Sequence, residues 1–337
     1  MNPIEVQPRP GDQSRNGGEV APVSDLKRDL VGANLAGKNL AGQDLSGRDL
    51  SGADLSGADL TDCRLNGAIL RNAVLARAKL DQAQFLGADL TGADLSEVVG
   101  DNAVFGRANL NEASLFSASL DDATFAHADL TNADMRAAQL DRARLREAKL
   151  IGTDLTRARI PEADLTRANL DRAVLRDVDM RRSRMKSVTG YSTTDWIGVD
   201  VLDVDYAGAY MVRRTIMDQN YLYEFRHKNR LNGVIYQIWW VTSDCGRSFV
   251  RWATWTFALA VLFAIAYTRL DMDYGPYESV LSPLYYSVVT MTTLGFGDAL
   301  PASPVAQVLS MAEVVIGHVM LGGMLSIFAT KMGRRAA

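Results

Sequence analysis

Residues 290–298 read Thr-Met-Thr-Thr-Leu-Gly-Phe-Gly-Asp, a composition that suits a backbone binding site for a cation. A dehydrated cation is held by aligned carbonyl oxygens, and the backbone that aligns them needs unusual φ values, which glycine adopts at low cost. Gly295 and Gly297 supply that freedom, and Thr293 adds a hydroxyl oxygen at the inner end. The spacing therefore predicts ion coordination by successive carbonyl groups.

The segment 285–298, Tyr-Tyr-Ser-Val-Val-Thr-Met-Thr-Thr-Leu-Gly-Phe-Gly-Asp, resembles the pore helix and selectivity filter of potassium channels over its whole length. A lone Gly-x-Gly is a common turn, but the two threonines before it and the aspartate after it make the match specific. The resemblance implies a pore helix over 280–292 and a filter over 293–298. The filter residues it implies are Thr293, Leu294, Gly295, Phe296, Gly297 and Asp298, with K+ bound at Thr293, Leu294, Gly295 and Phe296.

Two filter positions depart from the usual potassium-channel sequence. Leu294 stands where valine is usual, and Phe296 stands where tyrosine is usual, so a hydroxyl that braces the filter is missing. The number of carbonyl groups is unchanged, and a Gly-Phe-Gly filter also occurs among potassium-selective relatives. The sequence therefore favours a potassium-selective pore, with a nonselective cation pore as the alternative.

Two apolar stretches flank the filter, at 249–269 and 305–330. A bilayer core of about 30 Å needs about 20 helical residues, and both stretches meet that length. The mean hydropathy of the whole chain is only −0.05 because it averages a polar N-terminal part with this apolar tail. A buried helical hairpin of a soluble protein is the competing interpretation. The tail taken alone predicts a transmembrane pore domain over 249–337, all-α, with two spans.

Basic residues lie outside the two spans and acidic residues lie between them, which by the positive-inside rule predicts that both termini face the cytoplasm. The bases are Arg226, Lys228, Arg230, Arg247 and Arg251 before the first span, and Lys331, Arg334 and Arg335 after the second. The loop between the spans has Arg269 against Asp271, Asp273, Glu278 and Asp298. We expect a multi-pass protein of the cell (plasma or inner) membrane.

The rest of the chain has a period of five. From Leu30 to Met185, large apolar residues fill every fifth position, 32 in all, with Gly100 as the one exception. Two residues before them, from Ala53 to Ala173, alanine fills 22 of 25 sites. A period of five fits neither a helix nor an ordinary strand, and a short fixed repeat indicates a solenoid. If five residues form one side of a four-sided coil, the large residue and the alanine point inward.

Repeats such as Ser51-Gly52-Ala53-Asp54-Leu55 resemble the pentapeptide-repeat family. The resemblance implies a right-handed quadrilateral parallel β-helix, which we place at 29–186. Residues 1–28 are predicted to be a disordered tail. Residues 187–248 are predicted to be a connector, in which one helix caps the open end of the solenoid and a second lies at the membrane surface. In that connector, Ser243-Asp244 is the expected N-cap of the first span.

Two stretches of the repeat are irregular. Lys38, Gln43 and Arg48 occupy inward sites where small residues are usual, so the first coil is expected to be looser or to act as an end cap. Residues 96–102 lose the motif for one repeat without losing its phase, which predicts a substituted face and no inserted loop.

The composition excludes several function classes. No cluster of His, Cys and Asp, no phosphate loop and no nucleophile motif occurs, so the chain is not expected to be an enzyme or to use a cofactor other than the permeant K+. Acids and arginines are interleaved in the later coils, which makes a poor phosphate mimic and argues against a nucleic-acid role. The solenoid is interpreted as a scaffold for an unknown cytoplasmic partner. A membrane-anchored adaptor that binds a protein partner is the second alternative function.

A single chain supplies a single filter strand, so the resemblance implies self-association into a homotetramer surrounded by lipid. It also implies a gating hinge at Gly317, with Gly322 and Gly323 as rivals, although close helix packing explains the same residues. Glu313 and His318 lie on the same predicted span. Ionisable groups inside a membrane are usually functional or paired, so these two are candidates for pH sensing or for lining the pore.

Overall fold

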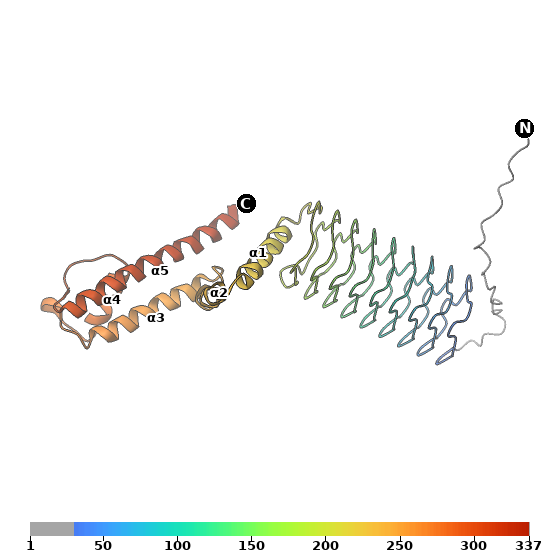
Figure 1. Ribbon diagram of the computed structural model, residues 1–337, viewed down its shortest axis with the longest axis horizontal. Coiled ribbons are helices and arrows are strands. Elements are labelled where there is room, and N and C mark those ends of the chain that lie inside the picture. The colour runs from blue at the N-terminus through green and yellow to red at the C-terminus, as the bar shows by residue number, and fades with distance from the viewer. Residues whose placement is uncertain (1–29, 337) are drawn as a thin grey trace, which may run out of the picture. The chain divides into compact units, whose positions relative to one another are not determined.

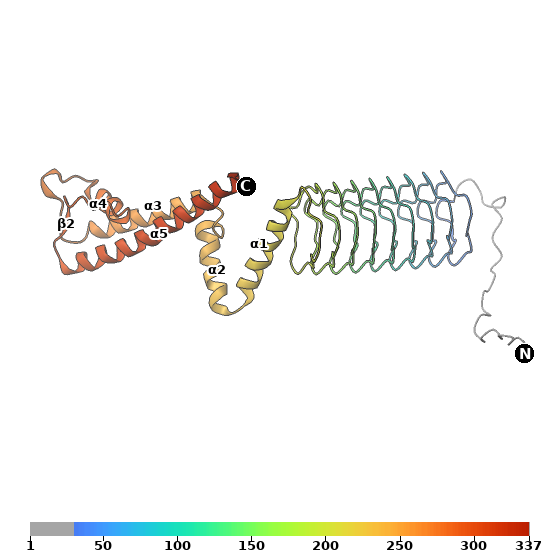
Figure 2. The same cartoon turned by 90° about the horizontal axis from the view of Figure 1, so that it is seen from above.

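The computed structural model describes residues 30–336 of the protein, and the tail predicted at 1–28 lies outside this range. The chain divides into two compact units, one ending at Tyr223 and the other beginning at Glu224. The first unit is a stack of short coils, and the second is made of helices (Figures 1 and 2). Each unit is described by itself.

The first unit is a four-sided parallel β-helix, which confirms the predicted fold class. Each coil takes twenty residues, so the residue in the middle of one face pairs with the residue twenty positions further on, from Asn34 with Asp54 to Asn169 with Thr189. Backbone hydrogen bonds join the coils, as from the amide of Leu35 to the carbonyl of Asp54 at 2.7 Å. The leucine and alanine columns that the period predicts form the interior of the stack and are buried.

The corners of the coils have a local chemical cause. Asp49, which precedes Leu50, accepts hydrogen bonds from the amide of Ser51 at 3.0 Å and from its hydroxyl at 2.6 Å. The next residue, Gly52, has φ of 65°, and the amide of Ala53 then bonds the carbonyl of Leu50 at 3.0 Å. This is the turn that aspartate and asparagine favour, because their side chains bond the backbone two residues on. Where aspartate or asparagine precedes the leucine, its side chain therefore stabilises the turn.

The first coil is regular where the sequence predicts a looser one. Its bridges to the second coil are complete from Asn34 to Asp49, so its backbone is as well paired as that of later coils. Lys38 is exposed, and Gln43 and Arg48 are half-buried. The long polar side chains at these inward sites therefore leave the backbone pairing of the first coil intact.

Gly100 keeps its place in the ladder, since its amide bonds the carbonyl of Ser119 at 2.9 Å. A Cβ atom at this position would lie 2.8 Å from Leu80 Cβ and 3.2 Å from Leu120 Cδ2. The leucines of the neighbouring coils thus occupy the space of the missing side chain. The prediction of a substituted face without an inserted loop is confirmed.

The ladder continues beyond the boundary predicted at residue 186 and takes in the first part of the predicted connector. Val174 pairs with Asp195 and Arg184 with Asp205, in a register shifted by one residue. The helix α1 (Tyr210–His227) follows, and its Val212 and Ile216 are buried against the solenoid core. Hydrogen bonds from Gln219 and Asn220 to backbone groups of Thr194 and Trp196 hold it there. A helix packed on the last coils thus lies where the sequence analysis predicts a cap.

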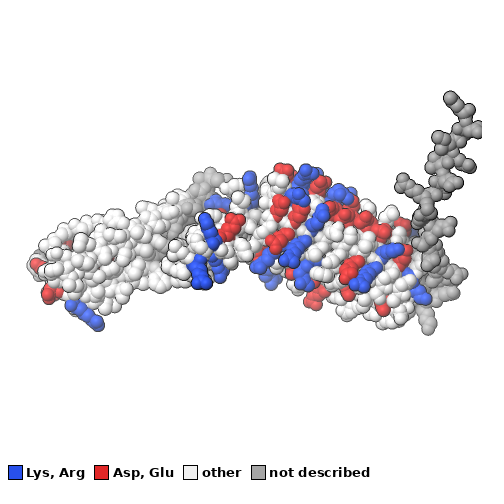
Figure 3. Space-filling view, viewed as in Figure 1, with Lys and Arg blue, Asp and Glu red and all other residues white. Residues whose placement is uncertain are grey.

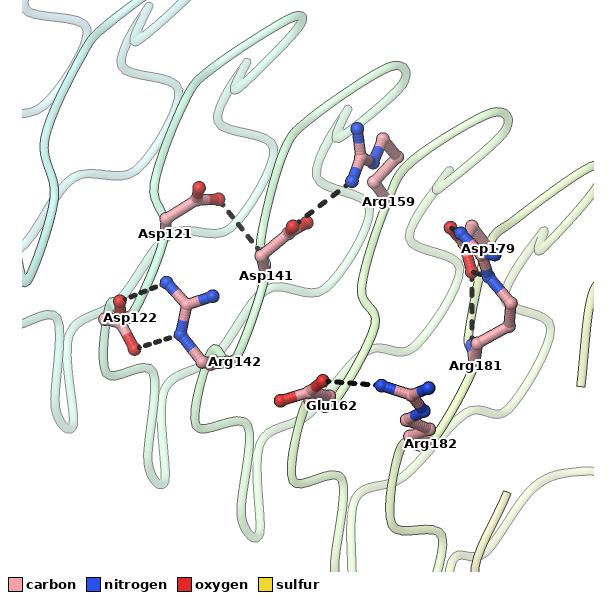
Figure 4. A network of polar contacts seen from close by, with 9 residues as sticks. All are labelled: Asp121, Asp122, Asp141, Arg142, Arg159, Glu162, Asp179, Arg181 and Arg182. Atoms are coloured by element: carbon pink, nitrogen blue, oxygen red, sulfur yellow. Dashed lines mark hydrogen bonds and ion pairs between the residues drawn. The ribbon is translucent and has the colours of Figure 1, made fainter. Parts of the chain in front are cut away.

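Charges of both signs cover the visible face of the solenoid (Figure 3). Many pair across adjacent coils, as Arg142 does with Asp122 at 2.6 Å and Arg182 with Glu162 at 3.5 Å (Figure 4). The hydrogen bond from Arg142 holds the pKa of Asp122 below its usual value. Exposed pairs of this kind add little stability individually.

The second unit contains the predicted helices in the predicted order. The two membrane-length helices, α3 (Phe249–Tyr267) and α5 (Pro304–Ala336), both pack against the short helix α4 (Ser282–Met291). The two-stranded antiparallel sheet pairs Met272 with Pro301. The first span begins at a different cap from the one predicted: the Ser248 side chain accepts from the amide of Arg251, whereas Ser243 ends the preceding helix. The elements are α2 (Arg230–Ser243), α3 (Phe249–Tyr267), β1 (Met272–Asp273), the 3-10 helix η2 (Gly275–Tyr277), α4 (Ser282–Met291), β2 (Leu300–Pro301) and α5 (Pro304–Ala336).

The solenoid core generates a first prediction. Leu130 is completely buried, and replacing it with aspartate would place a lone charge in the apolar interior, at a cost of several kcal/mol. We expect Leu130→Asp to abolish cooperative thermal unfolding of a fragment covering residues 26–227. The control is Gln139→Asp, which adds the same charge at an exposed site. Equal melting temperatures of the two variants, measured by circular dichroism, would contradict the assignment of faces.

The corner aspartates generate a second prediction. Hydrogen bonds from Ser51 lower the pKa of Asp49, and further carboxyl groups have a lowered pKa for similar reasons. Burial raises the pKa of Asp101 and Asp141, but fewer aspartates have a raised pKa than a lowered one. A lowered folded-state pKa stabilises the fold above the unfolded value of about 3.9, and this stabilisation is lost as the pH falls through the folded value.

We therefore expect the melting temperature of the 26–227 fragment to fall as the pH is lowered below about 4. Asp49→Asn keeps the acceptor for the Ser51 amide but cannot titrate, so its melting temperature should depend less steeply on pH. Identical slopes in this range would show that the turn carboxylates do not set acid stability.

Candidate ion-binding site

The predicted filter segment alternates between two backbone conformations. Thr293, Gly295 and Gly297 have φ values of 59°, 52° and 75°, and Leu294 and Phe296 between them are not in the left-handed region. The two glycines take these values at little cost, whereas a non-glycine residue such as Thr293 is strained there by about 1–3 kcal/mol. Strain of this size persists only where the surroundings enforce it, which marks this segment as specialised backbone.

The segment begins where α4 ends. The amide of Thr293 bonds the carbonyl of Thr290 at 3.0 Å, and the amide of Leu294 bonds the carbonyl of Val289 at 3.0 Å. These bonds fix the first filter residues to the last turn of the helix. The carboxyl end of a helix carries partial negative charge. The arrangement therefore favours a cation near the start of the segment.

The far end of the segment is fixed by a contact that the sequence analysis missed. The hydroxyl of Tyr285 on α4 donates a hydrogen bond to Asp298 Oδ2 at 2.8 Å. Phe296 has no hydroxyl with which to brace the filter segment. The bond from Tyr285 instead holds the segment at its last residue, Asp298. Both residues lie in the motif that the sequence singled out, but a pairing across 13 positions leaves no periodic signal.

The filter segment is open to one side of the chain. All six residues from Thr293 to Asp298 are exposed, including Leu294 at 62% and Phe296 at 64%. Beside them lies a hollow of about 780 Å³, which is lined by the filter segment, α4 and the first turns of α5. Large exposed apolar side chains next to an apolar hollow are typical of a surface that contacts another protein, a ligand or a membrane.

The three glycines of the second span differ in their surroundings. A Cβ atom on Gly317 would lie 2.3 Å from the carbonyl oxygen of Met291, the last residue of α4, and one on Gly323 would lie 2.3 Å from the Trp252 ring. Trp252 also donates its indole hydrogen to the carbonyl of Met320 at 2.6 Å. Nothing lies within 4 Å of a Cβ on Gly322. Gly317 and Gly323 therefore permit close packing, which was the alternative to a hinge at these positions.

The two ionisable residues of α5 also differ. Glu313 is completely buried between α3, α4 and α5, which argues against its predicted pore-lining role. His318 is exposed, and its Nδ1 lies 2.9 Å from the carbonyl oxygen of Val314. A pH-sensing or pore-lining role for His318 remains a prediction.

Two family matches cover the two units. Residues 29–62, 58–97, 101–136, 118–157, 138–177 and 148–186 match the family described as pentapeptide repeats, and residues 255–334 match the family described as ion channel. Two helices, Phe249–Tyr267 and Pro304–Ala329, are long and apolar enough to cross a membrane. The chain thus joins a run of pentapeptide repeats to an ion-channel pore domain, which confirms both resemblances.

Individual relatives agree with this division. Two pore potassium channel c of Oryza sativa subsp. japonica is 34% identical over an alignment of 83 residues. The match covers 20% of this chain and 18% of the channel. A voltage-gated potassium channel of Aeropyrum pernix is 36% identical over 55 residues, 16% of this chain and 19% of that one. The matches therefore span less than a fifth of the length of either channel.

Among solved structures, the chain is similar to HetL, a pentapeptide repeat protein of the cyanobacterium Nostoc, with 29% identity over 52% of this chain and 92% of HetL, at a TM-score of 0.20. A pentapeptide repeat protein of the Arabidopsis thaliana thylakoid lumen is 36% identical over 30% of this chain and 70% of its own, at a TM-score of 0.22.

The contact between Gly317 and Met291 generates a third prediction. We expect Gly317→Ala to push the end of α4 away from α5 and to destabilise the detergent-solubilised protein by about 1–3 kcal/mol, as overpacking does. Gly322→Ala is the matched control, because its Cβ meets open space and alanine is the better helix former. Melting temperatures that are equal for the two variants would show that α4 and α5 do not meet at Gly317.

Proposed function

We propose that the protein is a subunit of a homotetrameric, potassium-selective channel that conducts passively across the cell membrane. The observation that carries this proposal is the alternation of positive φ at Thr293, Gly295 and Gly297 in an exposed segment between two membrane-length helices. Such a backbone presents carbonyl groups to an ion in place of its water shell. The similarity to potassium channels supports potassium as the ion.

The ions are held by the carbonyl oxygens of Thr293, Leu294, Gly295 and Phe296, together with the hydroxyl of Thr293. Gly297 and Asp298 complete the outer end. A single strand offers carbonyl groups from one side only, so an ion in a pore requires the same strand from other subunits. The exposed side chains of Leu294 and Phe296 and the apolar hollow beside them support this assembly, since neighbouring subunits would cover them.

The orientation of the channel follows from its charges. The bases that flank the spans support a cytoplasmic position for both termini, with the acidic loop outside, where it raises the local cation concentration. Helix α2 lies at the inner membrane surface in this proposal, which its exposed apolar residues Leu231, Val234 and Ile238 support. The solenoid then serves as a cytoplasmic scaffold, and its interleaved charges do not favour nucleic acid.

Ion flux from reconstituted liposomes tests the proposal. We expect the wild-type protein to pass K+ in preference to Na+. Gly295→Ala should abolish selective flux, because alanine at φ of 52° is strained even though the space around it is open. Gly233→Ala in α2 is the control outside the filter, because its Cβ would meet only the carbonyl oxygen of Arg226 at 3.6 Å. A wild type that passes both ions equally would favour the nonselective pore, and a folded wild type that passes neither would favour the anchored adaptor.

The assembly is tested separately. Native mass spectrometry of the protein in mild detergent should give four copies of the 36.8 kDa chain. A monomeric or dimeric mass in protein that retains its flux would contradict the proposed ring of four filter strands.

A further inference from the structure

A buried carboxyl group links three elements of the pore unit. Glu313 on α5 is completely buried. Its Oε2 accepts a hydrogen bond from the hydroxyl of Tyr267, the last residue of α3, at 2.7 Å, and its Oε1 is hydrogen-bonded to Ser287 on α4. Tyr267 and Ser287 are also completely buried. The first span, the pore helix and the second span therefore meet at one side chain.

The hydroxyl groups around Glu313 have further partners. Ser287 Oγ lies 2.8 Å from the carbonyl oxygen of Ala260 on α3. On the neighbouring turn of α5, Ser310 Oγ lies 2.8 Å from the carbonyl oxygen of Ala306 and 3.0 Å from the hydroxyl of Tyr286. Both serines thus have a carbonyl oxygen as one partner, and a carbonyl oxygen can only accept.

The number of hydroxyl hydrogens limits which group donates and which accepts in these hydrogen bonds. A serine hydroxyl has one hydrogen, so Ser287 cannot donate to both the Ala260 carbonyl and Glu313 Oε1. When Ser287 donates to Ala260, its contact with Glu313 is a hydrogen bond only if Oε1 carries a hydrogen, while Oε2 accepts from Tyr267. If Glu313 were ionised, its Oε1 and the Ala260 carbonyl would share the single hydrogen of Ser287. The Ala260 carbonyl keeps its helical partner within α3 in either case, so the cost of ionisation falls on Glu313 itself, a buried carboxylate with hydroxyl partners.

The charges around Glu313 lead to the same conclusion. Its recorded partners within residues 30–336 are the hydroxyls of Ser287 and Tyr267, and no cation is among them. The titratable groups that join this hydrogen-bond network are Tyr267 on α3 and Tyr286 on α4. Arg251, Tyr285 and His318 on the same three helices are exposed. An unpaired buried charge is far more costly than a buried neutral acid.

We propose that Glu313 is a neutral carboxylic acid at neutral pH and acts as a positioning residue that holds the pore helix by donating a hydrogen bond to Ser287. Its consequence for ion flux rests on the proposed function, because α4 carries the filter segment at its end. The hydrogen-bond arrangement itself does not depend on conduction, so the two are tested by separate measurements.

Infrared spectroscopy of the full chain in detergent detects the proton directly. At neutral pH the wild type should show the carbonyl stretch of a protonated carboxylic acid, and Glu313→Gln should lose it. Glu278→Gln, which changes an exposed glutamate of the loop between the spans, should keep it. A wild-type spectrum without this band, or a band unchanged in Glu313→Gln, would overturn the proposal.

Stability distinguishes the neutral acid from a required charge. Glutamine donates through its amide and accepts through its carbonyl, so Glu313→Gln should keep the wild-type melting temperature, whereas Glu313→Ala should lose several degrees. Because Glu313→Ala also opens a cavity, Ser287→Ala provides a milder loss of the same bond. As the pH rises, ionisation should lower the melting temperature of the wild type relative to Glu313→Gln. A Gln variant as unstable as the Ala variant would contradict the neutral acid.

Flux in liposomes then separates this inference from the proposed function. Selective flux in the wild type and Glu313→Gln, reduced in Ser287→Ala, supports the positioning role. Absence of flux in every variant, with the infrared band and the stability pattern as expected, supports the neutral acid and overturns conduction. Full flux in Ser287→Ala overturns the positioning role.

Discussion

Every backbone carbonyl that leaves water needs a partner, and the two units of this chain meet that requirement in different ways. In the solenoid, the partner is the adjacent coil: the carbonyl of Asp54, for example, accepts from the amide of Leu35 in the coil before it. This ladder pairs the backbone groups of one coil with those of the next without needing water. In the filter segment, the carbonyl groups have no such ladder, which leaves them available to an ion.

Both units rely on residues in the left-handed region, but for different purposes. In the solenoid, the second residue after each leucine has φ near 60°, from Gly32 at 63° to Arg182 at 59°. Many of these are not glycine, so the strain is repeated along the stack and must be offset by the turn hydrogen bonds and the buried leucine columns. In the filter segment the strain is confined to Thr293, where two backbone bonds to α4 and the following glycines define the path.

The sequence predicted most of the fold because strict periods leave few alternatives. A period of five over 32 positions identified the inward columns, and all of them from Leu40 to Met185 except Gly100 are buried large side chains. The end of the solenoid was harder to predict: a one-residue shift after Thr189 breaks the period while the ladder continues to Asp205. A pattern of residue types cannot reveal a register change that backbone hydrogen bonds absorb.

The candidate site was predictable only where it is contiguous. The filter residues follow one another in sequence, whereas Glu313, Ser287 and Tyr267 come from three helices, and their meeting depends on how close those helices approach. That approach is set by small residues: Gly317 lets α5 touch the end of α4, and Gly323 accepts the ring of Trp252. Once backbones are this close, the gaps between them fit hydroxyl groups and one carboxyl group, each needing a partner in the low-dielectric interior. The glycines and the polar cluster therefore both belong to the close approach of α3, α4 and α5.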